Sequence, residues 1–306
     1  MEALVRAGAA PKAFVRYNAQ GRWGWLDDSP VKDHIEVVLG DVTDAASLRR
    51  AMQGVDVVFH LAALVSIPYS YQAVQSFLNT NVIGTANVLQ LALEESVGLV
   101  VHTSTSEVYG TAQYIPIDEH HPLQGQSPYS ATKIAADKLA EAFHRSYGLP
   151  VVTVRPFNTY GPRQSSRAVI PSIITQALGG QTVRLGHSWT VRDFTYVADT
   201  VRAYLLTAER QDAAGQVINV GSASEVTIEG LGRRIGDLLG KPVSIVWDEQ
   251  RARPVESEVA RLLADNRKAK TMIGWEPTVS LDDGLAATIA WIQQNLHAYR
   301  VGIYAI

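Results

Sequence analysis

Short apolar segments alternate with helix-like segments along most of the chain, and this alternation restricts the fold more than any other feature. Apolar runs typical of buried strands occur at 12–16, 35–39, 56–60, 99–103, 151–155 and 216–220. Segments with apolar residues at helical spacing lie between them, at 46–52, 77–95, 129–147, 170–178 and 197–209. Strands that alternate with helices indicate parallel strands joined by right-handed crossovers. We therefore expect an α/β fold with a doubly wound parallel sheet.

The pattern changes after residue 220. Helical spacing recurs at 228–239, 266–273 and 281–296, with one strand-like run at 243–247 and Thr227 as a candidate N-cap. These segments predict a smaller α/β lobe. The resulting division assigns residues 1–162 and 195–221 to a dinucleotide-binding domain, and residues 163–194 and 222–306 to a substrate-binding lobe.

Composition excludes several classes of protein. The chain has no cysteine, so disulfides, zinc–thiolate sites and a cysteine nucleophile are excluded. The net charge of −3 does not indicate a nucleic-acid-binding surface. No apolar run reaches the roughly 18 residues that a membrane helix needs, and residues 1–10 do not resemble a signal peptide. Without either segment, we expect a cytoplasmic protein. The histidines show no metal-binding spacing, so we expect no metal site.

One stretch concentrates groups with chemical potential. The apolar run at 99–102 leads directly into Ser104, Thr105, Ser106 and Glu107. In an open α/β sheet, ligands bind beyond the carboxyl ends of the strands. The stretch therefore predicts a site, although Glu107 could instead cap the turn that follows and Ser106 could be a plain turn residue.

Tyr129 and Lys133 are four residues apart in a predicted helix, so they share one face. A nearby ammonium favours the phenolate form of tyrosine, and such a phenol can act as a general base. Such a pair also occurs by chance, so its meaning depends on the strand end that precedes it.

The beginning of the chain lacks an expected feature. A dinucleotide-binding fold opens with a strand and a glycine-rich turn that brings backbone amides to the pyrophosphate. No such motif occurs before residue 40, and residues 1–8 read as the end of the helix that the turn would feed. We expect that the first strand and the turn are missing because the start is shortened or misassigned. The alternative is a protein that binds no dinucleotide.

Several short motifs occur together in a characteristic order. They are Gly40–Val42, His60–Ala63, Asn81–Thr85, Ser104–Gly110, Tyr129–Lys133, Arg155–Pro162 and Arg192–Phe194. With them the chain resembles the extended short-chain dehydrogenases/reductases of the NAD-dependent epimerase/dehydratase class, which have a Rossmann-like fold. Four further segments are similar to nucleotide-sugar 4,6-dehydratases of legionaminic-acid or bacillosamine-type pathways: Arg16–Asn18, Trp23–Leu26, Ser66–Ser70 and Gln124–Tyr129.

The resemblance implies a lyase reaction. Tyr129 would remove the proton of the sugar 4-hydroxyl while C4 gives its hydride to the nicotinamide. Lys133 would lower the pKa of Tyr129 and hold the nicotinamide ribose, and Thr105 would bind the 4-hydroxyl. Glu107 would remove the C5 proton before water leaves C6 and the hydride returns there. Some relatives carry an aspartate where this chain has Ser106, so the acid for the leaving hydroxyl is open between Glu107 and Ser106.

The resemblance also implies binding residues. Those for the cofactor are Arg16, Asp41, Val42, Leu61, Ala62, Ala63, Asn81, Tyr129, Lys133 and Pro156. Arg16 on charge alone favours NADP, whereas the resemblance favours NAD, so we predict NAD with NADP as the alternative. Asp41 could be only a turn residue, and His60 is expected to be structural.

A nucleotide diphosphate needs paired positive charge, which arginine supplies as a bidentate fork. The predicted substrate-binding residues are Asn158, Arg163, Val169, Pro171, Arg192 and Arg253. The resemblance implies UDP-N-acetylglucosamine as substrate, and a homodimer whose four-helix bundle uses residues 77–95 and 129–147. Core packing within a monomer explains the same apolar faces equally well.

Four functions stay open at this point. The first is the 4,6-dehydratase. The second is a 4-epimerase, which has no need of Glu107, or a uronic-acid decarboxylase, which needs a further cation for the C6 carboxylate. The third is a non-catalytic nucleotide-sugar binder, and the fourth is a truncated scaffold that binds no cofactor.

Overall fold

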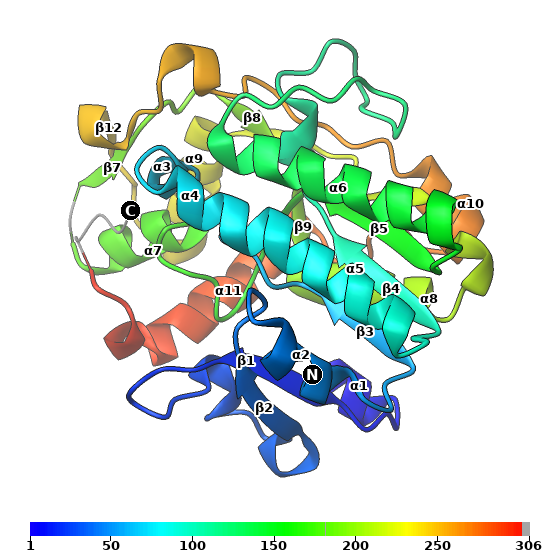
Figure 1. Cartoon of the computed structure of the whole chain (residues 1–306). Coiled ribbons are helices and arrows are strands. Elements are labelled where there is room, and N and C mark those ends of the chain that lie inside the picture. The colour runs from blue at the N-terminus through cyan, green and yellow to red at the C-terminus, as the bar shows by residue number, and fades with distance from the viewer. Residues whose placement is uncertain (181, 302–306) are drawn as a thin grey trace.

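A four-stranded parallel sheet forms the centre of the protein. The computed structural model describes residues 1–180 and 182–301. The strands lie in the order β10 (Val217–Val220), β5 (Val151–Pro156), β4 (Leu99–Thr103) and β3 (Val57–His60). Figure 1 shows this sheet between two layers of helices. The α/β class and the parallel pairing confirm the expectation from the alternating segments.

A second, two-stranded parallel sheet lies beside the first one. It pairs β1 (Lys12–Arg16) with β2 (Glu36–Gly40). Within the described residues no strand hydrogen-bonds β1 to β3. The short helix α1 (Glu2–Arg6) precedes β1, and its last turn ends close to Gly8 as the sequence predicts.

Alternate residues of the central strands point to opposite helix layers. Val100 and Val151 pack in one cluster with residues of α2 (Ala45–Met52), α5 (Gly84–Glu94) and α6 (Pro128–Tyr147). Leu99 and Val101 pack on the other face, with α8 (Val197–Ala208) and α10 (Arg267–Ile273). A strand buried on both faces reads as a continuous apolar run, which is why these strands could be predicted.

The remaining helices and strands form a smaller lobe with its own apolar cluster. The helices are α7 (Val169–Leu178), α9 (Ile228–Leu239) and α11 (Leu281–Gln294), and the parallel strands β7 (Val183–Leu185) and β12 (Ile245–Trp247) lie against them. Two short pairs lie between the lobes: β6 (Asn158–Tyr160) with β9 (Phe194–Tyr196), and β8 (Val191–Arg192) with β11 (Val226–Thr227). Thr227 caps α9 as predicted, since its hydroxyl accepts the Gly230 N–H.

One segment packs differently from the predicted division into domains. Residues 267–275 were expected in the smaller lobe, but Ala269, Ile273 and Trp275 pack in the cluster behind the central sheet. The Trp275 Nε1–H donates to the Asp199 carbonyl on α8 at 2.8 Å, which ties the segment there.

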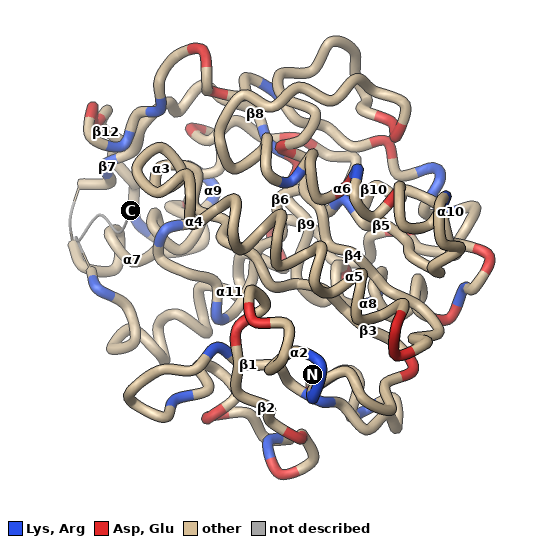
Figure 2. The backbone as a smooth tube through the Cα atoms, viewed as in Figure 1, with Lys and Arg blue, Asp and Glu red and all other residues tan. Residues whose placement is uncertain are grey.

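The other elements are short. They are α3 (Ile67–Ser70), α4 (Val74–Phe77), the π-helical turn η3 (Leu78–Ile83) and the 3-10 turns η1 (Gly24–Leu26), η2 (Lys32–His34), η4 (Ser106–Tyr109), η5 (Gln211–Ala213), η6 (Glu249–Arg251), η7 (Val255–Ser257) and η8 (Leu296–Ala298). Charges of both signs are scattered along the trace in Figure 2. Over the described residues, no helix could cross a membrane, and no cluster of three or more histidine or acidic side chains could hold a metal ion.

Candidate active site at the ends of β4 and β5

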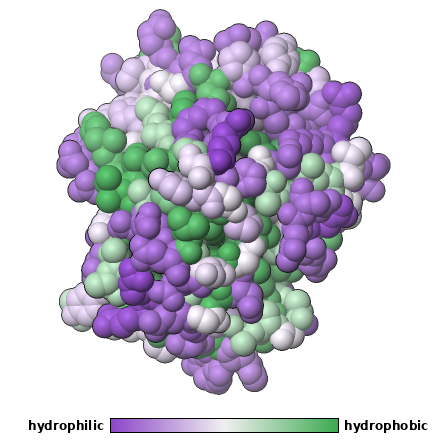
Figure 3. Space-filling view, turned by 45° about the vertical axis from the view of Figure 1, so that its right-hand side comes forward, coloured by the Kyte–Doolittle hydropathy of each residue, from purple (hydrophilic) through white to green (hydrophobic). Residues whose placement is uncertain are grey.

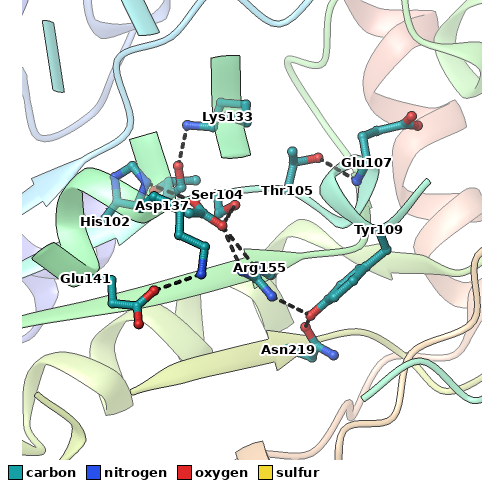
Figure 4. A network of polar contacts seen from close by, with 12 residues as sticks. His102, Ser104, Thr105, Glu107, Tyr109, Lys133, Asp137, Glu141, Arg155 and Asn219 are labelled. Carbon is teal, nitrogen blue, oxygen red and sulfur yellow. Dashed lines mark hydrogen bonds and ion pairs between the residues drawn. The ribbon is translucent and has the colours of Figure 1, made fainter. Parts of the chain in front are cut away.

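The hydroxyl-rich stretch after β4 forms a tight turn. Thr105 is the N-cap of η4, and its hydroxyl accepts the Glu107 N–H at 3.2 Å. This bond gives a partner to one of the backbone N–H groups that have no acceptor within the first turn of a helix. Ser106 is buried, whereas Glu107 is half-buried, and Figure 4 shows its carboxylate pointing away from the buried network behind the turn. The turn therefore presents one carboxylate to the site.

Helix α6 begins at a point that places its reactive residues against this turn. Ser127 and Ser130 form a capping box, and Pro128 occupies the first turn. Tyr129 is consequently in the first turn and Lys133 one turn later. The Tyr129 ring packs edge-on against Phe77, with 6.2 Å between the ring centroids. The Lys133 Nζ donates to the Thr103 carbonyl of β4 at 2.6 Å.

Burial is the largest influence on the pKa values of Tyr129 and Lys133. Burial raises the pKa of Tyr129, a hydrogen bond with the Thr105 hydroxyl lowers it, and the Glu107 and Asp137 charges raise it further. The Lys133 ammonium points to the Thr103 carbonyl. Burial lowers the pKa of Lys133 to about 8, against the opposing charge of Asp137. The Thr105 hydrogen bond thus favours the phenolate here, and the effect of Lys133 on the Tyr129 pKa stays a prediction.

Asn81 fixes the loop after β3 to helix α6. It lies in the π-helical turn η3, a feature common at functional sites. Its amide accepts the Leu64 N–H at 2.8 Å and donates to the Leu64 carbonyl at 3.0 Å and to the Thr132 hydroxyl at 3.1 Å. Both amide hydrogens are thus used inside the protein. Asn81 therefore positions the backbone of the loop and the neighbour of Lys133, and a direct contact with the cofactor stays a prediction.

The other predicted cofactor residues lie at the carboxyl ends of β1, β2, β3 and β5. Arg16 is exposed and Asp41 is half-buried, with 3.5 Å between Arg16 Nε and Asp41 Oδ2. Val42 is buried under Gly84, where an added Cβ would lie 2.7 Å from a Val42 methyl. Beyond β3, Leu61 is 60% exposed, next to exposed Ala62 and half-buried Ala63. Pro156 ends β5, and His60 is buried beside the Thr85 hydroxyl at 2.9 Å, as a structural residue would be.

This set fits the two ends of a nicotinamide dinucleotide. Arg16, Asp41 and the exposed loop 61–63 offer polar and apolar surface for an adenosine, and the Lys133 ammonium lies at the strand end where a nicotinamide ribose would bind. Over the described residues before residue 40, no glycine-rich turn joins a strand to a helix. The fit therefore concerns the ends of the cofactor and not its pyrophosphate.

Two predicted substrate residues meet at a carboxylate that the sequence did not single out. Glu258 Oε1 lies 3.1 Å from Arg192 Nη2 and 3.5 Å from Arg253 Nη1. Arg192 and Glu258 are both almost fully buried. Burial lowers the pKa of Arg192, and the Glu107 carboxylate is the largest opposing influence. The cluster therefore lies next to Glu107, with two arginines and two carboxylates in one place.

The other predicted substrate-binding residues differ in burial and in their partners. Asn158 is half-buried on β6, and its N–H donates to the Asp193 carbonyl at 3.1 Å. Val169 is half-buried at the start of α7, whereas Pro171 is buried within the helix. Arg163, predicted to help shape the base pocket, has a left-handed backbone (φ 68°) and donates to the Glu2 carboxylate at 2.7 Å.

Three buried charged residues near the site were missed. Asp137, Arg155 and Glu258 have partners that are distant in sequence, so no local pattern shows the pairs. Asp137 had one usable signal, since it is a charged residue on the otherwise buried face of α6, four residues after Lys133.

The comparisons with known proteins agree with this geometry. Residues 1–288 match the family described as GDP-mannose 4,6 dehydratase. A dTDP-glucose 4,6-dehydratase of Streptomyces antibioticus is 34% identical over 276 residues, which are 89% of this chain and 80% of that protein. The solved dTDP-glucose 4,6-dehydratase DesIV of Streptomyces venezuelae, with NAD and TYD bound, superposes with a TM-score of 0.85 at 32% identity, over 98% of this chain and 94% of that one. A UDP-glucuronic acid 4-epimerase of Bacillus cereus, solved with UDP-glucuronic acid and NAD, is 26% identical with a TM-score of 0.85, over 96% and 94% of the two chains.

Proposed function

Because this chain belongs to the GDP-mannose 4,6 dehydratase family, we propose that it is an NAD-dependent nucleotide-sugar 4,6-dehydratase. The net reaction converts a nucleotide hexose to its 4-keto-6-deoxy derivative and water. The observation that carries the proposal is the turn at Thr105 and Glu107, which lies against the helix start with Tyr129 and Lys133. The similar dehydratases and the NAD-bound structures support the same conclusion.

NAD, when bound, would supply the acceptor for the C4 hydride of the sugar and would return that hydride to C6, while C5 regains a proton. The residues that would hold its adenosine are Arg16, Asp41, Val42, Leu61, Ala62 and Ala63. Lys133 would bind the nicotinamide ribose, Pro156 would lie beside the ring, and Asn81 would act by fixing the loop. NADP remains the alternative that Arg16 favours on charge alone.

Tyr129 takes the proton of the 4-hydroxyl as hydride leaves C4. The phenolate that this step needs is favoured by Thr105, whose hydroxyl bonds Tyr129 in the structure. Thr105 also accepts the Glu107 N–H, so a single hydroxyl sets the spacing between the base for the 4-hydroxyl and the base for C5. Lys133 contributes positive charge at the strand end.

Glu107 removes the C5 proton, which the 4-keto group has acidified. The electron pair of the C5–H bond becomes the C5–C6 double bond, and the hydroxyl leaves C6 as water after it gains a proton. Glu107, now protonated, supplies that proton directly or through the Ser106 hydroxyl. Ser106 is buried next to Glu107, so a relay would be shielded from solvent.

The geometry favours this reaction over its relatives. A 4-epimerase needs no base at C5, yet Glu107 faces the site. A uronic-acid decarboxylase or epimerase must place a carboxylate at C6, but Arg192 already lies between two carboxylates, Glu107 and Glu258. An unpaired carboxylate in such a place costs several kcal/mol. The non-catalytic binder and the scaffold without cofactor leave the Thr105–Tyr129 arrangement without a purpose.

We propose UDP-N-acetylglucosamine as the substrate, on the motif resemblance, with dTDP-glucose as the alternative that similar enzymes suggest. The full chain is incubated with NAD and, separately, with UDP-N-acetylglucosamine, dTDP-glucose, GDP-mannose and UDP-glucuronic acid, and the products are analysed by mass spectrometry. Loss of one water from the preferred sugar is expected. An unchanged mass with inverted C4 identifies an epimerase, loss of carbon dioxide identifies a decarboxylase, and no conversion of any sugar contradicts the proposal.

The arginine cluster gives a prediction about nucleotide binding. Replacing Arg253 by Gln is expected to weaken UDP binding about tenfold or more, because a hydrogen bond to a charged group is worth about 1.5–3 kcal/mol. Arg253 suits this test because its side chain is partly exposed. Isothermal calorimetry measures the affinity, with Arg233→Gln on the outer face of α9 as the matched control. Equal affinities of the two variants would remove Arg253 from the diphosphate site.

The assembly is proposed to be a homodimer through a four-helix bundle. Helices α5 and α6 lie side by side on one face of the molecule (Figure 1). Val74 of α4, Leu78 and Ile83 of η3, which precede α5, and Tyr147 of α6 are exposed, and Figure 3 shows hydrophobic surface interrupting the hydrophilic one across the middle of the molecule. Sedimentation equilibrium of the purified chain tests for a species of two copies.

A further inference from the structure

Asp137 lies on the same face of α6 as Tyr129 and Lys133. The three residues are spaced four apart, so each is one turn from the next. Lys133 reaches the Thr103 carbonyl of β4, and Asp137 reaches the residues on either side of Thr103. Figure 4 shows Asp137 at the centre of this network, behind the turn that carries Glu107.

The Asp137 carboxylate is fully surrounded by donors. Its Oδ2 accepts the Ser104 hydroxyl at 2.8 Å and two N–H groups of Arg155, from Nε at 3.1 Å and from Nη2 at 2.9 Å. Its Oδ1 lies 3.2 Å from His102 Nε2. All four residues are buried. Burial opposes ionisation of Asp137, but the His102 hydrogen bond and the Arg155 charge outweigh it and hold its pKa below the ordinary value.

The Asp137 carboxylate thus stabilises the positive charges of two buried side chains. Lys133 and Arg155 are both buried, and Asp137 is the negative charge that stabilises each of them. Isolated buried charges are costly, and removal of one partner leaves the other uncompensated. Without Asp137, burial would act on the Lys133 ammonium unopposed.

The same carboxylate is linked to the turn that bears Glu107. Arg155 Nη1 donates to the Tyr109 hydroxyl at 3.0 Å, and Tyr109 donates to the Asn219 side-chain oxygen at 2.7 Å. Tyr109 is the last residue of η4, two residues after Glu107. A chain of buried hydrogen bonds therefore joins the helix of Tyr129 and Lys133 to the turn of Glu107 (Figure 4).

We propose that Asp137 is a positioning residue that keeps the Lys133 ammonium charged and in place and, through Arg155 and Tyr109, holds the Glu107 turn against α6. The claim about the Lys133 charge does not depend on the proposed function, since it stands on the burial of both groups and on their positions one turn apart on the same face of α6. The claim about turnover rests on the function proposed above, in which Lys133 must carry its charge when Tyr129 acts.

The groups that face Lys133 come from several elements. Among the described residues they are Tyr129 and Asp137 on α6, His60 at the end of β3, His102 and the Thr103 carbonyl on β4, and Tyr204 on α8, whose hydroxyl binds Thr103. Burial lowers the pKa values of both histidines, so both are neutral near pH 7. Asp137 is then the carboxylate that determines how far the Lys133 pKa falls.

The direct test is a titration of Lys133 that needs neither cofactor nor substrate. The sequence has few lysines (Lys12, Lys32, Lys133, Lys138, Lys241, Lys268 and Lys270), so carbon-13 labelling at lysine Cε gives a simple spectrum. Loss of one signal in Lys133→Met assigns it. Wild type is expected to titrate near pH 8. Asp137→Asn, which keeps the shape, is expected to titrate about 1–3 units lower, the effect of a lost close charge.

Ser104→Ala is the matched control, because it removes one hydrogen bond to Asp137 and leaves the charge. Its Lys133 titration is expected to follow wild type. Circular dichroism confirms that each variant is folded. If Asp137→Asn does not fold, Asp137→Glu, which retains a carboxylate, is compared with Asp137→Gln at the same position. Equal Lys133 titration with and without the carboxylate overturns the proposal.

The second readout is the pH profile of turnover. Activity that needs the Lys133 ammonium falls as the pH rises through the pKa of that group, so Asp137→Asn shifts the alkaline limb to lower pH. A merely structural defect lowers the rate by the same factor at every pH and leaves the limb in place, which would contradict the positioning role. If wild type converts no nucleotide sugar, the proposed function fails, and the Lys133 titration still decides this inference.

Discussion

Replacing Tyr129 by Phe is expected to reduce product formation about a thousandfold, within the range of 10²–10⁴ typical for loss of a general base. The ring contact with Phe77 is kept, and only the hydroxyl near Thr105 is lost. Mass spectrometry of the product over time measures the effect.

The matched control is Tyr160→Phe. Tyr160 is also fully buried, and its hydroxyl donates to the Leu281 carbonyl in the smaller lobe at 3.1 Å. Its loss is expected to lower stability slightly and to leave the rate within a factor of a few. UDP affinity should be the same in both variants, because neither hydroxyl belongs to the arginine cluster. A Tyr129→Phe variant as active as Tyr160→Phe would exclude the phenol as the base.

Elements determined by local pattern could be predicted closely. The strand at 12–16 matches β1, and the helix at 129–147 differs from α6 by one residue because Pro128 joins the first turn. Apolar periodicity and caps act within one or two turns of chain, so they are visible in the sequence. The residues that carry the resemblance follow the predicted strands in the sequence. They lie together because a parallel sheet places the carboxyl ends of its strands along one edge.

Features that depend on distant partners could not be predicted. The short strands β6, β8, β9 and β11 are only two or three residues long, and they exist through pairings between segments that are distant in sequence. The helix expected at 77–95 contains a π-helical turn, and no pattern signals that its Asn81 bonds Leu64 and Thr132. The orientation of Lys133 toward Thr103 is likewise set by β4 and not by the spacing from Tyr129.

The ion pairs of the site also could not be predicted from the sequence. Arg192 and Arg253 were predicted to bind a diphosphate, and the structure places both next to the Glu258 carboxylate, which the sequence did not indicate. A buried ion pair of this kind is formed by residues 66 positions apart, so only the fold shows it. The consequence is functional, because the two carboxylates near Arg192 disfavour a sugar that carries its own carboxylate at C6.

Glu107→Gln is expected to separate oxidation from elimination. Glutamine keeps the size of the side chain and the N–H that bonds Thr105, but it cannot accept the C5 proton. The 4,6-dehydration rate should fall about 10²–10⁴-fold, as for loss of a general base. Oxidation at C4 by Tyr129 should continue, so reduced nicotinamide should still form in a single turnover, while exchange of the C5 hydrogen with deuterated water should stop.

Ser106→Ala serves as the companion variant, because the two groups that could protonate the leaving hydroxyl predict different results. If Ser106 relays the proton, its alanine variant exchanges C5 hydrogen at the wild-type rate but loses water slowly. If Glu107 acts twice, Ser106→Ala eliminates water normally. Continued C5 exchange in Glu107→Gln would show that another group is the base, and Glu107 would then be a positioning residue of the turn. The Glu107 charge raises the pKa of Arg192, so Glu107→Gln removes a negative charge beside this arginine. This variant should therefore also accept a sugar with a C6 carboxylate, which the wild-type site repels.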